Sequence, residues 1–144
     1  MFTIDKNINK EIEDRISWNN LWIEMAELVS KRSVDPKFKV GCVIVSKDNT
    51  RVLALGYNGD HKGGPNERES MQSGQSGFIH AEINALIKAD FANHQDKIMY
   101  LTHSPCYMCS KAIINAGIKE VYYKTPYDKE AIKFLNKYIP VIKR

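Results

Sequence analysis

The chain has 144 residues, of which 43% are hydrophobic and 26% are charged, a composition typical of one soluble globular domain. It contains no apolar run long enough to span a membrane, and the polar, charged residues 1–10 do not resemble a signal peptide. The formal charge of +4 is modest and scattered, which argues against a basic nucleic-acid-binding face. We therefore expect no membrane partner and no nucleic-acid partner.

The cysteine content points to a reducing compartment. Three cysteines cannot all pair with one another, and no export signal is recognisable in the sequence. In that setting, metal binding or catalysis is a better explanation for cysteines than disulfides. We expect a cytoplasmic protein.

The first half of the chain predicts a helix and a hairpin, followed by a long irregular segment. Ser17 suits the N-cap of a helix with apolar residues at three- and four-residue spacing, which must end before Pro36. The apolar, β-branched run at residues 40–46 predicts a buried strand, and residues 51–57 its antiparallel partner. Residues 58–77 are rich in glycine and polar side chains, and irregular segments of this length are usually functional or disordered.

The second half alternates between helix and strand. The predicted elements are a helix at residues 80–91, a strand at 97–102, a helix at 105–117, a strand at 121–123, a helix at 128–138 and a strand at 138–142. Pro140 suits only an edge strand. The whole order predicts an α/β fold, a three-layer α/β/α sandwich with a mixed five-stranded sheet. We expect a single domain over residues 1–144, with an N-terminal extension at 1–16 and a long functional loop at 58–77.

Two short motifs carry candidate chemistry. His80-Ala81-Glu82 stands at the start of one predicted helix, and Pro105-Cys106-Tyr107-Met108-Cys109 at the start of another. Two cysteines three residues apart on a helix N-terminus project from one turn, and the helix dipole favours their thiolates. With His80 they provide three ligands for zinc and leave a fourth position open for water, the catalytic arrangement.

Glu82 lies too close to His80 in sequence for comfortable joint ligation, but it is well placed beside a metal-bound water. A carboxylate there can take the proton from that water and return it to a leaving amine. The pattern H-x-E followed by P-C-x-x-C is the signature of zinc-dependent nucleobase deaminases. Either motif alone is weak, since redox motifs and structural zinc sites share C-x-x-C, but their co-occurrence favours a deaminase. Cys42, inside an apolar strand, is interpreted as a small buried hydrophobe.

At these residues the chain resembles the cytidine deaminase superfamily and, within it, the deoxycytidylate (dCMP) deaminases. The resemblance runs from about Trp18 to about Tyr127 and rests on four stretches of sequence. These are Asp35-Pro36-Lys37-Phe38-Lys39-Val40-Gly41, Gly56-Tyr57-Asn58-Gly59, His80-Ala81-Glu82-Ile83-Asn84-Ala85 and Ser104-Pro105-Cys106-Tyr107-Met108-Cys109. It implies one zinc-dependent deaminase domain that converts dCMP to dUMP and ammonia for thymidylate synthesis, with Glu82 as the catalytic proton carrier.

The resemblance also implies a substrate site. The backbone around Ser104 would hold the exocyclic amine, the ring would sit near Ala81, and Asn58 would face the deoxyribose. Lys37 and Tyr127, with Lys124, would bind the 5′-phosphate. A solvated surface is the alternative for Lys37 and Lys124.

Family members are typically hexamers that dCTP activates and dTTP inhibits. By resemblance, Gly56, Tyr57, Asn58 and Gly59 would form the effector site, and Mg²⁺ would accompany a bound nucleoside triphosphate. A tight glycine turn is the alternative explanation for this motif. The segment at residues 58–77 has no cysteine and only one histidine, His61, so we expect one Zn²⁺ per chain rather than two.

Two other functions compete with this one. A deaminase of nucleic acid or of another cytosine nucleoside would keep the same zinc motif, although nucleic acid would call for a more basic groove. A non-catalytic, zinc-binding competence-type protein would keep the fold without the chemistry. Glu82 argues against that function, because a structural zinc site has no use for a carboxylate beside an open ligand position.

Overall fold

The structure is a computed structural model, and it describes residues 14–144. Of the predicted N-terminal extension, residues 1–13 lie outside the described residues. The elements are α2 (Trp18–Ser30), β1 (Gly41–Ser46), β2 (Val52–Tyr57), α3 (Ala81–Lys88), β3 (Lys97–His103), α4 (Tyr107–Asn115), β4 (Glu120–Thr125), α5 (Lys129–Leu135) and β5 (Val141–Lys143). Their order confirms the predicted succession of elements.

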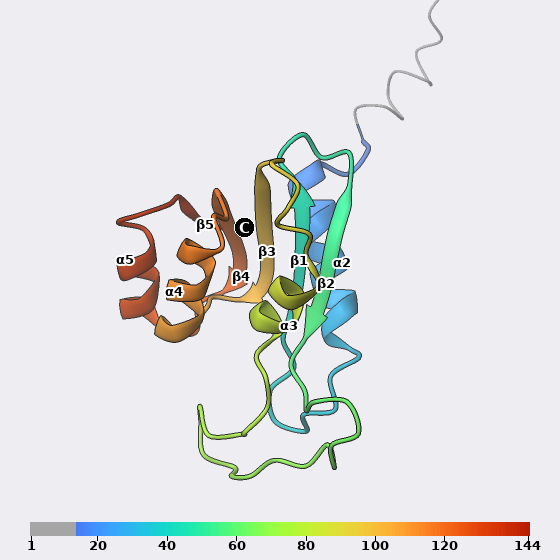
Figure 1. Ribbon diagram of the computed structural model, residues 1–144, viewed down its shortest axis with the longest axis vertical. Coiled ribbons are helices and arrows are strands. Elements are labelled where there is room, and N and C mark those ends of the chain that lie inside the picture. Colours follow the sequence, from blue (N-terminus) through green and yellow to red (C-terminus); the bar gives the residue numbers. More distant parts are fainter. Residues whose placement is uncertain (1–13) are drawn as a thin grey trace, which may run out of the picture.

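The five strands form one mixed sheet in the order β2-β1-β3-β4-β5. Strand β1 pairs antiparallel with both β2 and β3, whereas the pairs β3–β4 and β4–β5 are parallel. Helix α2 covers one face of the sheet, and α3, α4 and α5 cover the other (Figure 1). This confirms the predicted α/β/α sandwich.

The side chains of β1 point alternately to the two faces of the sheet and so contribute to both hydrophobic cores. Cys42 and Ile44 pack in the core beneath α3, α4 and α5, whereas Val43 and Val45 pack against α2. All four side chains are fully buried, as expected for a strand covered on both faces. The interpretation of Cys42 as a buried hydrophobe is confirmed.

Helix α3 lies unusually close to β2 because β2 carries a glycine at the contact. A Cβ atom on Gly56 would lie 2.4 Å from the carbonyl oxygen of Ala81 and 2.5 Å from the backbone nitrogen of Ala85. Only glycine permits that approach. Gly56 therefore fixes the height of α3, and of its first turn, above the sheet.

Several boundaries differ from the prediction. Helix α3 ends at Lys88 rather than at residue 91, because Ala89 has an extended backbone with φ −72° and ψ 143°. Helix α4 begins after Cys106, which is its N-cap, and not at Pro105. Strand β5 is shorter than predicted because Tyr138 and the next residue still donate backbone hydrogen bonds to Leu135.

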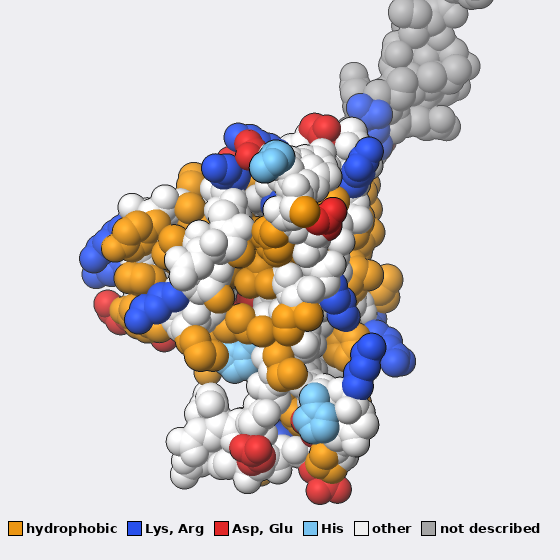
Figure 2. Space-filling model, in the orientation of Figure 1, with side chains coloured by type: hydrophobic (Ala, Val, Ile, Leu, Met, Phe, Trp, Pro, Cys, Tyr) orange, Lys and Arg blue, Asp and Glu red, His pale blue; other side chains and the backbone are white. Residues whose placement is uncertain are grey.

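The segment at residues 58–77 contains no helix or strand, and one isolated bridge, between Gly59 and Ile79, closes its base. It extends as a separate lobe beyond the ends of the strands (Figure 1), and most of its surface is neither hydrophobic nor charged (Figure 2). Within residues 14–144, no helix has both the length and the apolar character needed to cross a bilayer.

Candidate metal centre and substrate cavity

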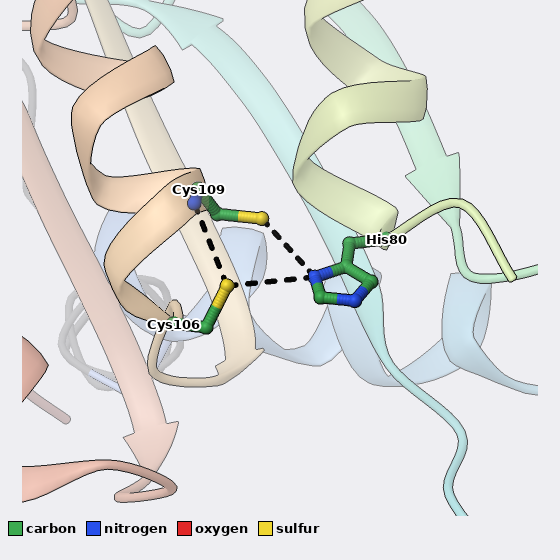
Figure 3. A group of neighbouring side chains, drawn as sticks. All are labelled: His80, Cys106 and Cys109. Carbon is green, nitrogen blue, oxygen red and sulfur yellow. Dashed lines mark hydrogen bonds between the residues drawn. The ribbon is translucent and has the colours of Figure 1, made fainter. Parts of the chain in front are cut away.

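Two helix starts bring the predicted metal ligands together. His80 is the N-cap residue of α3 and Cys106 that of α4, and both helices lie on the same face of the sheet. Figure 3 shows both sulfur atoms directed at the imidazole of His80. His80 Nδ1 lies 3.2 Å from Cys109 Sγ and 3.6 Å from Cys106 Sγ, and the three ligand atoms all lie within 4.8 Å of one another.

These separations fit a tetrahedral zinc ion. Zinc bonds of 2.3 Å to sulfur and about 2.0–2.1 Å to nitrogen, at tetrahedral angles, place S and N ligand atoms roughly 3.6 Å apart. The distances of 3.2 and 3.6 Å in the structure lie within about 0.4 Å of that separation. A mixed His/Cys/Cys donor set also suits zinc better than it suits a hard cation such as Mg²⁺.

The local electrostatics favour thiolate at Cys106. Its hydrogen bond with the Cys109 thiol lowers the pKa of Cys106 to about 4, although burial opposes the shift. The backbone N–H of Cys109 also donates to Cys106 Sγ at 3.5 Å. The hydrogen bond with Cys106 raises the pKa of His80 in turn. The hydrogen bond between the two cysteine side chains also raises the pKa of Cys109, so that the thiolate is favoured at Cys106 rather than at Cys109.

Glu82 lies in the first turn of α3 and is only 4% exposed. Burial raises the pKa of its carboxyl group above the ordinary value, more than the nearby His80 lowers it. A buried carboxyl group with a raised pKa can both release and accept a proton near neutral pH. The helix places this group beside the ligands but not among them.

A cavity of about 170 Å³ opens directly onto these residues. Its metal end includes His80, Glu82 and Cys106. Its far end is formed by the loop after α2, by Asn58 directly after β2, by the long irregular segment and by Tyr127 after β4. The residues of that far end include Asp35, Lys37, Phe38, Asn58, Arg68, Ser73, Gly74, Ser76 and Tyr127.

Five of the six residues predicted for the substrate site line this cavity. They are Lys37, Asn58, Ala81, Ser104 and Tyr127. Ser104 Oγ accepts the backbone N–H of Tyr127 at 2.8 Å, so that these two residues are held together. The amide of Asn58 is committed to the protein: its Oδ1 accepts from the Val40 N–H at 2.9 Å, and its Nδ2 donates to the Phe38 carbonyl at 2.7 Å.

The structure does not bring Lys124 to the cavity, which corrects the prediction for this residue. Lys124 Nζ forms an exposed ion pair with Glu27 of α2 at 2.6 Å. Its neighbour Tyr123 packs in the core beneath α3, α4 and α5. Since successive strand residues point to opposite faces, Lys124 points to the α2 face, away from the metal centre.

The Gly56-Tyr57-Asn58-Gly59 motif divides among three environments. Gly56 packs against α3, and Asn58 is buried in the wall of the cavity just described. Tyr57 and Gly59 line a second, open cavity beside Asp60, His61 and the cationic side chains of Arg32 and Lys62. The four residues therefore do not form one contiguous surface.

Sequence reasoning missed several residues of the cavity. Asp35 and Phe38 belong to a stretch quoted for the family resemblance but received no role, and Arg68 and His103 were not singled out. The ring of Phe38 contacts those of His103 and Tyr127, with centroids 4.4 and 5.4 Å away, and forms an aromatic wall. Burial lowers the pKa of His103, which keeps this imidazole neutral.

Comparison with known proteins agrees with this geometry. Residues 16–125 match the family described as the cytidine and deoxycytidylate deaminase zinc-binding region. The chain belongs to this family. The resemblance to deoxycytidylate deaminases is also confirmed, because several curated relatives carry that name.

Among these relatives, ComE operon protein 2 of Bacillus subtilis is 38% identical over 79% of this chain and 62% of its own length. The deoxycytidylate deaminase of Schizosaccharomyces pombe is 38% identical over 81% of this chain and 40% of its own length. The mouse deoxycytidylate deaminase is 32% identical over 79% of this chain and 68% of its own length. The chain thus spans less than two thirds of the first two of these proteins.

Among solved structures, the dCMP deaminase of cyanophage S-TIM5, determined in complex with dCMP and dUMP, matches with a TM-score of 0.75 and 30% identity. The match covers 99% of this chain and 100% of that one. A tRNA:A34 deaminase structure matches with a TM-score of 0.59 at 19% identity, which shows a shared fold only.

Proposed function

We propose that this chain is a zinc-dependent hydrolase, one domain over residues 1–144, that deaminates dCMP to dUMP and ammonia. The observation that carries the proposal is a His/Cys/Cys cluster of zinc geometry that opens, beside the buried carboxyl group of Glu82, onto a cavity. The likeness to the cyanophage enzyme over the full length of both chains supports the choice of substrate. The product would supply the synthesis of thymidylate.

His80, Cys106 and Cys109 would hold one zinc ion, which when bound supplies Lewis-acid activation of a water molecule. Glu82 would take a proton from that water and donate it to N3 of the cytosine ring. The oxygen of the water would add to C4, and the same carboxyl group would then take the remaining hydroxyl proton and pass it to the exocyclic amine, so that the C4–N bond breaks and ammonia leaves. Burial supports this role, because the raised pKa of Glu82 lets it hold a proton between the two steps.

Residues along the cavity would orient the nucleotide. We assign the backbone around Ser104 to the exocyclic amine, the region of Ala81 to the ring and Asn58 to the deoxyribose. Lys37 and Tyr127 would bind the 5′-phosphate. The Lys37 ammonium donates one hydrogen bond to the carbonyl of Met71, which leaves two donors for an anion.

A comparison of substrates tests the proposal. The zinc-loaded full chain is assayed spectrophotometrically on dCMP, on deoxycytidine and on a tRNA anticodon stem-loop. We expect deamination of dCMP with a kcat/KM at least about 100-fold above that for deoxycytidine, because the phosphate contacts contribute about 3 kcal/mol to binding in the transition state. Preferred turnover of the nucleoside or the RNA would instead favour the other deaminase functions.

The non-catalytic alternative makes a different prediction for Glu82. A structural zinc site gains nothing from burying a carboxyl group next to the metal, since burial of an ionisable group costs stability. Under that alternative, Glu82→Gln would change no activity and would raise the melting temperature. Under the proposed function, it abolishes turnover.

We further propose that dTTP inhibits and dCTP activates the enzyme, with Mg²⁺ bound to the triphosphate, in a cytoplasmic homo-hexamer. The support is family resemblance together with the second cavity. There Tyr57 and Gly59 lie beside Arg32 and Lys62, and cationic side chains of this kind suit a triphosphate.

Equilibrium binding tests the proposed regulation. Binding of dTTP to the Glu82→Gln protein is measured with and without dCMP, and size-exclusion chromatography reports the oligomeric state. Linkage requires that dTTP and dCMP weaken each other by one common factor. Simple competition for the zinc-side cavity would contradict an effector site near Tyr57.

A further inference from the structure

The outer wall of the substrate cavity has no regular secondary structure. Arg68, Ser73, Gly74 and Ser76 line the cavity from the irregular segment. A wall of this kind can define a binding site only if something fixes it in place.

The Arg68 side chain organises this segment from within. Its Nε donates to the carbonyl of Ser70 at 2.9 Å, and its Nη2 donates to the carbonyl of Gln72 at 3.3 Å. The remaining terminal nitrogen, Nη1, donates to Asp35 Oδ2 at 2.6 Å. One guanidinium group thus binds two carbonyl groups of its own loop, those of Ser70 and Gln72, and attaches the loop to Asp35 in the body of the domain.

Asp35 connects that loop to two other walls of the cavity. Its Oδ1 accepts the backbone N–H of Lys37 at 2.9 Å, and its Oδ2 also lies 3.4 Å from Asn58 Nδ2. The amide of Asn58 in turn holds Phe38 and Val40 through their backbones. A single carboxylate therefore joins the loop after α2, the end of β2 and the irregular segment.

Burial distinguishes this ion pair from the other side-chain hydrogen bonds that join residues 68–74 to the rest of the cavity. The side chains of Arg68 and Asp35 are only 6% and 2% exposed. The contacts from Lys37 Nζ to the Met71 carbonyl and from Ser73 Oγ to the Tyr127 hydroxyl are both exposed. An ion pair shielded from water keeps its strength, whereas exposed contacts are weakened by solvent and salt.

We propose that the Asp35–Arg68 ion pair is a positioning element that holds residues 68–73 across the cavity and sets the affinity for the nucleotide substrate. Neither residue is one of the three metal ligands, and neither is the proton carrier Glu82. The proposal rests on the proposed function for the identity of the substrate, dCMP.

Kinetics of three variants test it. We expect Arg68→Met and Asp35→Asn each to raise KM for dCMP at least about tenfold while kcat changes less than about threefold, the pattern of lost uniform binding. Arg68→Lys keeps the charge but not the fork of donors, and we expect an intermediate KM. The matched control is Glu27→Gln, which breaks an ion pair of equal length, 2.6 Å, on the α2 face, and it should leave KM unchanged.

Single variants leave one buried charge unpaired and can unfold for that reason alone. The double variant Asp35→Asn with Arg68→Met removes both charges, so we expect its melting temperature to recover toward that of the wild type while KM stays raised. A folded double variant with wild-type KM would overturn the proposal, and so would a loss confined to kcat.

Hydrogen exchange separates this proposal from the proposed function. The amides of Glu69, which donates to the Ser76 carbonyl at 2.8 Å, and of Gln75, which donates to Gln72, report the closure of the loop. We expect peptides over residues 68–77 to exchange at least about tenfold faster in the double variant than in Glu27→Gln. Unchanged exchange would overturn the positioning role, even if the wild-type protein proved inactive on dCMP, a result that would count only against the proposed function.

Discussion

The two ends of the substrate cavity are built in different ways. At the metal end, His80, Glu82 and Cys106 stand at the first turns of helices whose positions the sheet fixes. At the loop end, the wall has no regular structure, and a buried ion pair between Asp35 and Arg68 holds it. Under the proposed function, the two ends divide the work: helices fixed by the sheet carry the chemistry, and a loop fixed by one ion pair holds the nucleotide.

The largest effect should come from the metal end. Glu82→Gln removes the proton carrier but leaves the three ligands intact, so we expect kcat for dCMP to fall by about 10²–10⁴-fold at unchanged zinc content. Steady-state kinetics and elemental analysis of the same sample measure both quantities. A variant that kept more than about a tenth of the rate would remove Glu82 from the proton transfers.

Loss of one of the three metal ligands should remove zinc from the metal end of the cavity. Cys109→Ala leaves two protein ligands, and we expect zinc affinity to fall by more than about 100-fold, together with the melting temperature, because the ion joins α3 to α4. Cys42→Ala is the control, since Cys42 is buried in the core and is not one of the three converging ligands. Full zinc occupancy in Cys109→Ala would show that another residue completes the site.

Gly56 and Gly59 belong to the same motif, but their replacement should have different effects on the free energy of unfolding. Gly56→Ala puts a Cβ within 2.4 Å of the Ala81 carbonyl oxygen and should cost about 1–3 kcal/mol of unfolding free energy. A Cβ at Gly59 would meet nothing within 4 Å, so Gly59→Ala should stay within about 0.5 kcal/mol. Chemical denaturation measures both, and equal effects would contradict the packing role of Gly56.

The smallest effect concerns pH at the loop end. Burial raises the pKa of Asp35, but hydrogen bonds from the Arg68 side chain and from the backbone N–H groups of Lys37 and Phe38 outweigh it, so that the pKa lies below 3.8. A depressed pKa in the folded state gives stability that is present above the ordinary pKa and is lost as pH falls through the folded value.

The wild type should therefore lose stability relative to the Asp35→Asn, Arg68→Met double variant only below about pH 4. Urea denaturation at about pH 6, about pH 5 and about pH 3.5 measures the difference in unfolding free energy between the two proteins. A difference that stayed constant over that range would mean that the carboxyl group of Asp35 does not stabilise the fold through its ionised form.

The difference between the metal end and the loop end of the cavity also explains which site residues could be predicted from the sequence. The ligands lie within two short motifs at helix starts, and the order of helices and strands brings those motifs to one face of the sheet, so local patterns were sufficient. Arg68 and Asp35 are 33 residues apart, and Arg68 lies in an irregular segment without periodicity. No local pattern predicts which partner such a residue will meet.

One residue of the predicted substrate site and one of the predicted effector site have structural surroundings that the prediction did not include. Lys124 was assigned to the phosphate from the family resemblance, whereas the alternation along β4 turns it toward α2. Counting residues from the apolar core position Tyr123 would have shown this. Gly56 was assigned to an effector site by the same resemblance, and the structure adds a packing role, the close approach of α3, that sequence alone does not reveal.

Zinc content and dCMP turnover, measured on one preparation of the full chain, test whether the protein is a zinc-dependent dCMP deaminase. We predict about one zinc per chain and conversion of dCMP to dUMP with release of ammonia. Turnover should cease when a chelator removes the metal and return when zinc is restored. A folded, fully zinc-loaded protein that leaves dCMP unchanged would contradict the account.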